Sequence, residues 1–323
     1  MVCTFYRQEP PEALEDLFFE FLEAKQADGC ASATIETYKN MFHSVSKWLD
    51  VKMSIRNVTD RTIRSAVAKM AGTDLSRNTI RSYTATLKTF FSWLRQEDLT
   101  DVDVKLFKGE ETIKETYTDA DLQRLLVRPG RMANFCEWRN WAIVNVLVNN
   151  GCRASTIRNM QIRDVNLEDM VIRYRHTKSR RQQAAPVSPA LADVLTVYLK
   201  IRCGQPEDWL FPDREGYQMS TNCLRNAIRA YNTARGVKLT SIHAFRHTFA
   251  RIYLVECNGN ALKLQRLLGH STLDMTKHYV KIYSEDLVKD FEKTSPLEAI
   301  KKTSHPRTPT RRPTAPAPEE RRL

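Results

Sequence analysis

Apolar residues recur at intervals of three and four residues through the first part of this chain, with polar residues between them. This spacing places the apolar side chains on one face of an α-helix. The pattern appears over residues 14–22, 35–49, 63–70 and 80–94. Amphipathic helices must bury their apolar faces against one another, so this part of the chain is expected to fold as a helical bundle.

A break follows these patterns. Around residues 101–117 polar and charged residues dominate, as in K-G-E-E-T-I-K-E-T at 108–116, which indicates a linker between two domains. A length of 323 residues agrees with two domains. Beyond the linker, T-D-A-D-L-Q-R-L-L at 118–126 starts with a helix cap. The sequence therefore predicts a second folded domain from residue 118 onward.

The second domain contains one extended stretch. Residues 165–175 include β-branched and aromatic side chains, a polar turn follows at 177–183, and residues 184–187 complete a short hairpin. The apolar stretch Trp141–Val148 is interrupted by Asn145, so it predicts a buried helix; a membrane span needs roughly 18 to 20 apolar residues. The second domain is thus expected to be mostly helical, with one hairpin.

The charge balance favours a polyanionic partner. Lys and Arg number 50 against 38 Asp and Glu, which gives a net charge of +12. Basic residues lie between the apolar positions of the predicted third and fourth helices, on faces that either contact DNA or are simply solvated. These residues are Arg61, Arg64 and Lys69 on the third helix, and Arg77, Arg81 and Lys88 on the fourth.

The cysteine content and the N-terminal residues predict an intracellular protein. The seven cysteines are odd in number and form no C-x-x-C pair, so neither a disulfide framework nor a zinc ribbon is indicated. Residues 1–11 lack the apolar core of a secretion signal. Residues 301–323 are rich in Pro, Arg and Thr, which predicts a disordered tail that is either an electrostatic tether or inert.

The densest group of functional side chains lies near the C-terminal end. In H-A-F-R-H at 243–247, the two histidines and the arginine share one helical face. In L-L-G-H-S-T-L-D-M-T-K-H-Y at 267–279, a glycine turn precedes His270 and a short helix carries Tyr279. The question is what these residues do together.

The residues of these two segments, combined with Arg153 and the hairpin residue Lys178, have the chemistry to cleave a phosphodiester. Guanidinium groups of Arg153 and Arg246 are able to grip the nonbridging oxygens and neutralise the charge of the transition state, so no metal is needed. A tyrosine with a pKa of about 10 is a poor nucleophile unless a base assists it, and His243 is the candidate base. Lys178 is the candidate acid that protonates the leaving alkoxide.

The order and spacing of these residues resemble a tyrosine recombinase of the phage integrase family, which includes the chromosome-dimer resolvases. The likeness covers roughly residues 12–298. It rests on N-N-G-C-R-A-S at 149–155, H-T-K-S-R-R at 176–181, the H-x-x-R box, and L-G-H-S at 268–271 followed by the tyrosine. The resemblance implies two phosphate-clamping arginines, a general acid, a proton-shuttling histidine, a phosphate-binding histidine and a nucleophile. These are, in turn, Arg153 and Arg246, Lys178, His243, His270, and Tyr279.

The resemblance also implies the reaction and the fold. Strands are cut and rejoined through a 3′-phosphotyrosyl intermediate and a Holliday junction, with no ATP, metal or other cofactor. The fold is mainly α, with a helical SAM-like core-binding domain and a mostly helical catalytic domain that has a small antiparallel β-sheet. Together they form a two-domain clamp around DNA. The expected parts are an N-terminal extension at 1–10, the core-binding domain at 11–100, the linker at 101–117, the catalytic domain at 118–299 and a disordered basic tail at 300–323.

The expected partners follow from the same resemblance. They are double-stranded DNA with two inverted half-sites, further copies of the chain, and an accessory DNA-bending protein as an optional partner. The copies form a dimer on each site and a tetramer in the synapse, where residues 283–292 either reach a neighbouring protomer or pack on their own. We expect a cytoplasmic, nucleoid-associated protein with no membrane partner. The expected DNA backbone contacts are Arg61, Arg64, Arg77, Arg81 and Lys88.

Two positions depart from the family pattern. Asn150 replaces a Thr, and Thr156 replaces a Glu that helps to hold the first arginine, which leaves the support of Arg153 open. Activity is still expected, because neither change removes a group that touches the phosphate. The rival interpretations are a non-cleaving DNA-binding accessory factor of the same fold and a type IB topoisomerase-like enzyme. The basic tail and the unusual arginine box favour a mobile-element integrase over dimer resolution or inversion, while motifs do not record the target site.

Overall fold

The computed structural model describes residues 13–110, 114–175 and 183–269. The chain forms two compact units, residues 1–112 and 113–323. Each unit has its own hydrophobic core. Within the described ranges, no helix is both long and apolar enough to cross a membrane.

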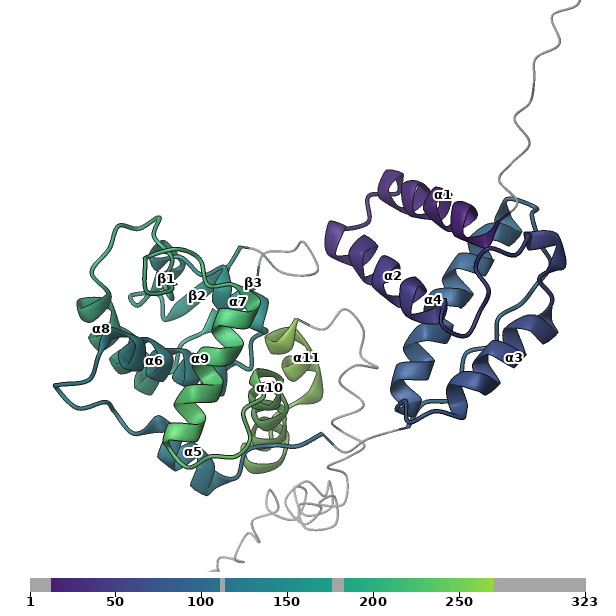
Figure 1. Ribbon diagram of the computed structural model, residues 1–323. Coiled ribbons are helices and arrows are strands. Elements are labelled where there is room, and N and C mark those ends of the chain that lie inside the picture. The colour runs from purple at the N-terminus through teal and green to yellow at the C-terminus, as the bar shows by residue number, and fades with distance from the viewer. Residues whose placement is uncertain (1–12, 111–113, 176–182, 270–323) are drawn as a thin grey trace, which may run out of the picture. The chain divides into compact units, whose positions relative to one another are not determined.

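The first unit is helical (Figure 1). All of the predicted helices are present, which confirms the interpretation of the apolar spacing. They are α1 (Leu14–Ala27), α2 (Ser32–Val45), α3 (Asp60–Ala71) and α4 (Arg77–Gln96), with the short turn η1 (Ile55–Asn57) after α2. Helix α4 packs against each of the other α-helices, so it is the central element of this unit.

Side-chain caps determine where α3 and α4 begin. Thr59 precedes α3 and forms a reciprocal capping box with Thr62. Ser76 caps α4 by accepting a hydrogen bond from the N–H of Thr79. Each cap satisfies a backbone donor that the first helical turn leaves without a partner, a contribution of about 1 kcal/mol.

Aromatic side chains from three helices form the centre of the first core. Phe18 of α1 stacks on Phe42 of α2 with ring centroids 3.7 Å apart, and Phe90 of α4 meets Phe18 edge-on at 5.1 Å. All three rings are buried. Burial of a phenylalanine ring stabilises a fold by about 1.5–3 kcal/mol, so these rings hold α1, α2 and α4 together.

The predicted linker begins inside the core of the first unit. Val102 and Val104 are buried there, and the N–H of Phe107 donates to the Thr84 hydroxyl on α4 at 3.1 Å. Residues 101–110 therefore pack along the helical unit instead of only connecting it to the next one. The predicted domain boundaries themselves stay predictions.

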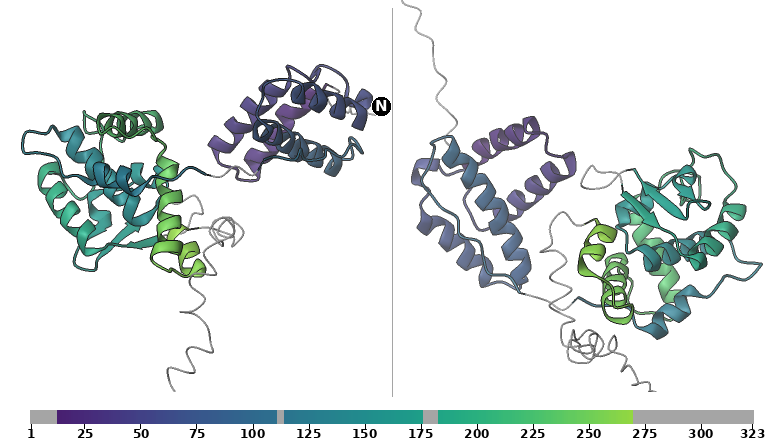
Figure 2. Two further views of the ribbon diagram at one scale, coloured as in Figure 1. Left: turned by 90° about the horizontal axis from the view of Figure 1, so that it is seen from below. Right: turned by 180° about the vertical axis from the view of Figure 1, so that it is seen from behind.

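The second unit is also mostly helical, with one small sheet (Figures 1 and 2). This arrangement confirms the predicted fold class, mainly α with a small antiparallel sheet. The helices are α5 (Asp119–Leu126), α6 (Phe135–Asn150), α7 (Ala154–Arg158), α8 (Pro189–Arg202), α9 (Thr221–Ala234), α10 (Ile242–Arg251) and α11 (Ala261–Leu268). The short helical turns are η2 (Ile162–Asp164) and the π-helix η3 (Ile252–Glu256).

The sheet contains the predicted hairpin. Strands β1 (Val165–Asn166), β2 (Val171–Tyr174) and β3 (Gln183–Pro186) are antiparallel neighbours in the order β1-β2-β3. Tyr174 pairs with Gln183 at the end of the ladder that lies next to the turn. Residues 176–182, which connect β2 to β3, lie outside the described residues.

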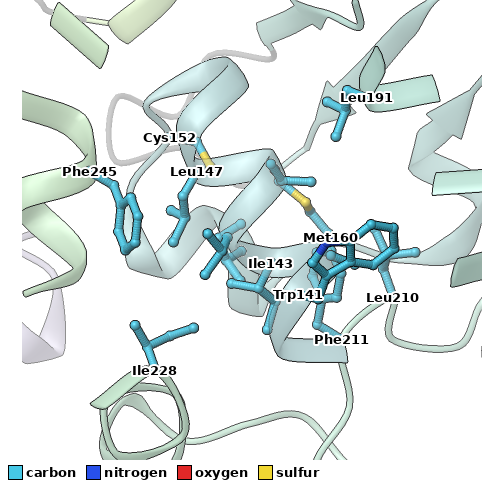
Figure 3. Close-up of a cluster of buried hydrophobic side chains, with 14 of the residues drawn as sticks. Trp141, Ile143, Leu147, Cys152, Met160, Leu191, Leu210, Phe211, Ile228 and Phe245 are labelled. Atoms are coloured by element: carbon cyan, nitrogen blue, oxygen red, sulfur yellow. The ribbon is translucent and has the colours of Figure 1, made fainter. Parts of the chain in front are cut away.

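Helix α6 runs through the centre of the second core. It is buried on nearly every side, as predicted for the interrupted apolar stretch, and Ile143 and Leu147 are fully enclosed. Figure 3 shows Phe245 of α10 pointing toward Leu147, with Cys152 close to the same leucine. The packing of α10 on α6 therefore brings the H-x-x-R helix next to the segment that carries Arg153.

Candidate active site

Arg153 follows a sharp turn between α6 and α7. Gly151 ends α6 in the left-handed conformation, with φ of 56°. An added Cβ at Gly151 would lie 2.6 Å from the ring of Phe249, so only glycine fits where the chain turns against α10. Arg153 is the half-buried N-cap residue of α7.

Arg246 reaches the same place from α10, where its side chain is only 2% exposed. Its Nη1 donates to the carbonyl oxygen of Gly151 at 3.0 Å, and its Nη2 donates to that of Leu268 at 2.9 Å. A buried guanidinium requires such partners because removing a charge from water is costly. The two bonds hold the planar group in one orientation.

The two arginines meet at the C-terminal end of α11. Arg153 donates from Nη1 to the carbonyl oxygen of Leu268 at 3.5 Å and from Nη2 to that of Gly269 at 3.3 Å. The oxygen of Leu268 therefore accepts from both side chains. The last carbonyls of a helix lack intrahelical donors and form the negative end of its dipole, which suits two cationic groups. We call Arg153 and Arg246 the arginine pair.

His243 lies one turn before Arg246 on α10 and is exposed. Neighbouring protein atoms still remove part of its hydration, and this desolvation lowers the pKa of His243 below its ordinary value of 6.5. The positive charges of Arg246, Arg153 and Lys114 lower this pKa further. At neutral pH the imidazole is therefore mainly uncharged and able to accept a proton.

The residues on both sides of the hairpin turn are anchored. Arg175 donates from Nε to Oδ1 of Asp164 at 2.5 Å, and the Asp164 side chain is only 1% exposed. On the other side, Nε2 of Gln183 donates to the carbonyl oxygens of Arg266 and Leu267 at 2.8 and 2.7 Å. One flank of the hairpin is thus fixed by a buried carboxylate and the other by the end of α11.

The two residues that depart from the family pattern, Asn150 and Thr156, are both buried and hydrogen-bonded. Asn150 is buried and donates to the hydroxyl of Tyr174 at 2.9 Å. Thr156 is buried in α7, where its N–H donates to the carbonyl oxygen of Arg153 at 2.9 Å. The sequence left the support of the Arg153 side chain open because the family Glu is missing. The structure supplies that support from the carbonyl groups that end α11.

A buried cysteine lies next to the arginine pair and is not a nucleophile. Burial raises the pKa of the Cys152 thiol to about 12, although Tyr174 and Arg246 act in the opposite direction. Cysteine attacks as a thiolate, so a thiol with this pKa is unreactive at neutral pH. Cys152 belongs to the hydrophobic core behind the site.

Some predicted residues lie outside the described ranges, and their roles stay predictions. They are Lys178, His270 and Tyr279, together with residues 283–292 and the tail at 300–323. The predicted DNA contacts are all described, and all are exposed on the first unit. They are Arg61 and Arg64 on α3, and Arg77, Arg81 and Lys88 on α4. In the described residues, no three or more His, Cys, Asp or Glu side chains gather in a way that could hold a metal ion.

Sequence reasoning missed Gln183 and Lys114. Gln183 is the last residue of the predicted hairpin turn, and Lys114 lies in the predicted linker. Their effects leave no pattern in the sequence, because Gln183 binds backbone carbonyls and Lys114 acts on His243 through its charge.

Comparison with known proteins decides the family. Residues 118–286, more than half of the chain, match the phage integrase family, and residues 16–98 match the phage integrase N-terminal SAM-like domain. The chain belongs to the phage integrase family. The predicted enzyme class, a tyrosine recombinase that cleaves and rejoins DNA, is thereby confirmed.

Curated relatives cover almost the whole recombinase. The tyrosine recombinase XerA of Thermococcus kodakarensis is 28% identical over 298 residues, which are 90% of this chain and 98% of the relative. The tyrosine recombinase XerC of Thermodesulfovibrio yellowstonii is 26% identical over 286 residues, which are 84% of this chain and 93% of the relative.

Solved structures agree with the fold of the recombinase. The Tn1549 transposon integrase in complex with a circular intermediate DNA matches with a TM-score of 0.70 and 19% identity, over 83% of this chain and 95% of that one. A lambda integrase tetramer bound to a Holliday junction matches with a TM-score of 0.65 and 14% identity, over 83% of this chain and 77% of that one.

Proposed function

We propose that this recombinase cuts one strand of a specific duplex DNA site with Tyr279 as nucleophile. The tyrosine oxygen attacks the scissile phosphorus, the bond from phosphorus to the 5′ oxygen breaks, and a 3′-phosphotyrosyl bond forms. The phenol proton passes to His243, and Lys178 donates a proton to the leaving 5′ oxygen. The reverse reaction with the 5′ hydroxyl of another duplex exchanges the strands.

The convergence of the arginine pair is the observation that carries this proposal. A phosphodiester gains negative charge on its nonbridging oxygens as the nucleophile adds. Arg153 and Arg246 share the oxygen of Leu268, so both guanidinium groups lie next to the same carbonyl. The acceptors of these bonds are neutral carbonyl oxygens, which do not themselves cancel the charge of a guanidinium. Two cationic groups held in this way suit the negatively charged transition state of phosphoryl transfer.

His270 completes the proposed phosphate site. It directly follows Gly269, which ends α11 in the left-handed conformation with φ of 64°, and whose carbonyl oxygen accepts a hydrogen bond from Arg153. The proximity of Gly269 to the arginine pair supports a role for the next residue at the same phosphate. We assign His270 a hydrogen bond to a nonbridging oxygen.

We further propose that the substrate is duplex DNA with two inverted half-sites. Two copies of the chain bind each site and four form the synapse. Among the structural neighbours, one structure is a lambda integrase dimer on a core site and another is a tetramer on a Holliday junction, which supports these stoichiometries. A protein with a net charge of +12 gains affinity for DNA through its phosphates.

The proposed DNA contacts on the first unit are not equivalent. Arg77 already binds within the unit: its Nη2 donates to the carbonyl oxygen of Lys108 at 3.2 Å, and its guanidinium lies 5.2 Å from the ring centre of Phe107. Loss of Arg77 would therefore also disturb the segment after α4. The exposed Lys88 is a cleaner probe of backbone contact than Arg77.

As the biological process we propose the integration and excision of a mobile element, in the cytoplasm at the nucleoid. The basic tail and the departures at Asn150 and Thr156 favour this process over dimer resolution. The likeness to a transposon integrase agrees with it. An accessory DNA-bending protein would assist synapsis.

The test is to incubate the full chain with a pool of its flanking genomic DNA, without metal, and to look for an SDS-resistant adduct. Wild type should carry a 3′-phosphate on Tyr279, located by mass spectrometry, and Tyr279→Phe should bind the same DNA without forming the adduct. An adduct on Tyr279→Phe would overturn the nucleophile assignment. Tight binding by wild type without an adduct would favour the accessory factor, and supercoil relaxation without joining of two sites would favour the topoisomerase.

A further inference from the structure

The side chain of Gln183 binds the C-terminal end of α11. Gln183 is the first residue of β3, and its Nε2 donates to the carbonyl oxygens of Arg266 and Leu267 at 2.8 and 2.7 Å. Its Oε1 lies against Gly269, where an added Cβ would be only 2.5 Å away. The amide therefore fits this turn closely, with its donor toward two carbonyls and its acceptor toward a residue without a side chain.

Gln183 and the arginine pair bind consecutive carbonyls of one turn. Gln183 takes those of Arg266 and Leu267, while the arginine pair takes those of Leu268 and Gly269. The carbonyl oxygen of Arg266 also accepts the N–H of Gly269 at 3.1 Å, and the carbonyls at the very end of a helix lack intrahelical donors, so side chains and water compete for them. A shift of the turn would move the acceptor that the arginine pair shares.

We infer that Gln183 is a positioning residue for the arginine pair, an inference that rests on the proposed function. By holding the carbonyls of Arg266 and Leu267, it keeps the oxygen of Leu268 directed at both guanidinium groups. Arg153 is the more sensitive partner, because its bonds of 3.5 and 3.3 Å are longer than the 2.9 Å bond of Arg246 to the same turn. A displaced guanidinium would stabilise the transition state less well.

The test compares two variants of Gln183 with a matched control. Gln183→Glu keeps the shape but replaces the donor by oxygen, and Gln183→Ala removes the whole group. Gln218→Ala is the control, because Nε2 of Gln218 also donates to a carbonyl at a helix end, that of Arg158 at 3.2 Å, in the same unit. Single-turnover adduct formation is measured on ordinary DNA and on DNA with an uncharged methylphosphonate at the scissile position.

On ordinary DNA, both Gln183 variants should cut about 10- to 100-fold more slowly than wild type, with DNA binding retained, and Gln218→Ala should stay within about 3-fold. On methylphosphonate DNA the Gln183 defect should fall to about 3-fold or less, because that substrate needs less charge neutralisation. A normal rate on ordinary DNA, or an equal defect on both substrates, would overturn the positioning role.

A second measurement separates this inference from the proposed function. The Nε–H resonances of Arg153 and Arg246, assigned by replacing each arginine with lysine in ¹⁵N-arginine-labelled full-length protein, report their surroundings without any reaction. The chemical shifts of both resonances should change in Gln183→Ala and stay the same in Gln218→Ala. If wild type forms no adduct on any DNA, the proposed function fails, and these resonances alone decide the inference. Unchanged chemical shifts in Gln183→Ala would then refute the positioning role.

Discussion

Arg153 and Arg246 donate hydrogen bonds to one oxygen, the backbone carbonyl of Leu268. One arginine begins α7 and the other lies within α10, so neither helix alone sets their separation. The packing of α10 on α6 brings them together, and the shared acceptor at the end of α11 joins them. The arrangement brings two cationic side chains to one place in the fold.

Replacement of Arg246 by lysine should show that geometry matters in addition to charge. Lysine keeps the charge but cannot bond to Gly151 and Leu268 from one planar fork. Adduct formation by Arg246→Lys should fall by about 10²- to 10³-fold, the usual effect of losing one transition-state donor. Arg124→Lys, at an exposed side chain on α5, is the control. Cleavage by Arg246→Lys within about 3-fold of wild type would contradict the assignment.

Lys178→Ala should slow cleavage of ordinary DNA because the 5′ oxygen leaves poorly without a proton. A 5′-bridging phosphorothiolate has a sulfur leaving group that departs as a thiolate without protonation. On this substrate Lys178→Ala should match wild type, whereas Tyr279→Phe should remain inactive on both. Single-turnover rates on the two substrates provide the comparison, and a defect of equal size on both would remove the general-acid role.

The rate of adduct formation should depend on pH through His243. Its pKa lies below 6.5, so the pH–rate profile should have a rising limb whose midpoint lies below pH 6.5. The rate should level off at neutral pH, where the imidazole is uncharged. Lys114→Gln removes a positive charge that lowers this pKa, so the pKa should rise and the limb should move to higher pH. Lys238→Gln, an exposed charge elsewhere in the unit, should leave the limb in place. An unchanged limb in Lys114→Gln would be inconsistent with this assignment.

Gly269→Ala should destabilise the second unit by more than backbone strain alone. Its φ is 64°, and Gly236 in the same unit has φ of 67°, so alanine at either position costs about 1–2 kcal/mol in strain. At Gly269 the new Cβ also meets Oε1 of Gln183 at 2.5 Å, whereas at Gly236 the nearest atom is 3.9 Å away. Urea unfolding should therefore give a larger loss for Gly269→Ala, by about 1 kcal/mol or more.

The same pair of residues supplies a check on that prediction. In a Gln183→Ala background the clash disappears, so Gly269→Ala should cost no more than Gly236→Ala does. An excess cost that persists without the glutamine would show that some other contact is responsible.

The helices and the hairpin were predictable because their signals are local. The spacing of Leu14, Phe18 and Phe21 predicts the buried face of α1 within a single helix, and the cap at the start of residues 118–126 predicts where α5 begins. The H-x-x-R spacing likewise places His243 and Arg246 on one face of α10. None of these predictions requires knowledge of what the element packs against.

The sequence by itself determined the helices of both units and the placing of His243 and Arg246 on one face of α10. Only the tertiary structure decided how Arg153 is held, since the expected glutamate is absent and the carbonyls of Leu268 and Gly269 take its place. The role of Gln183 was hidden for the same reason. Every residue has a backbone carbonyl, so a hydrogen bond to it leaves no trace in residue identity, and it forms only when packing brings the two segments together.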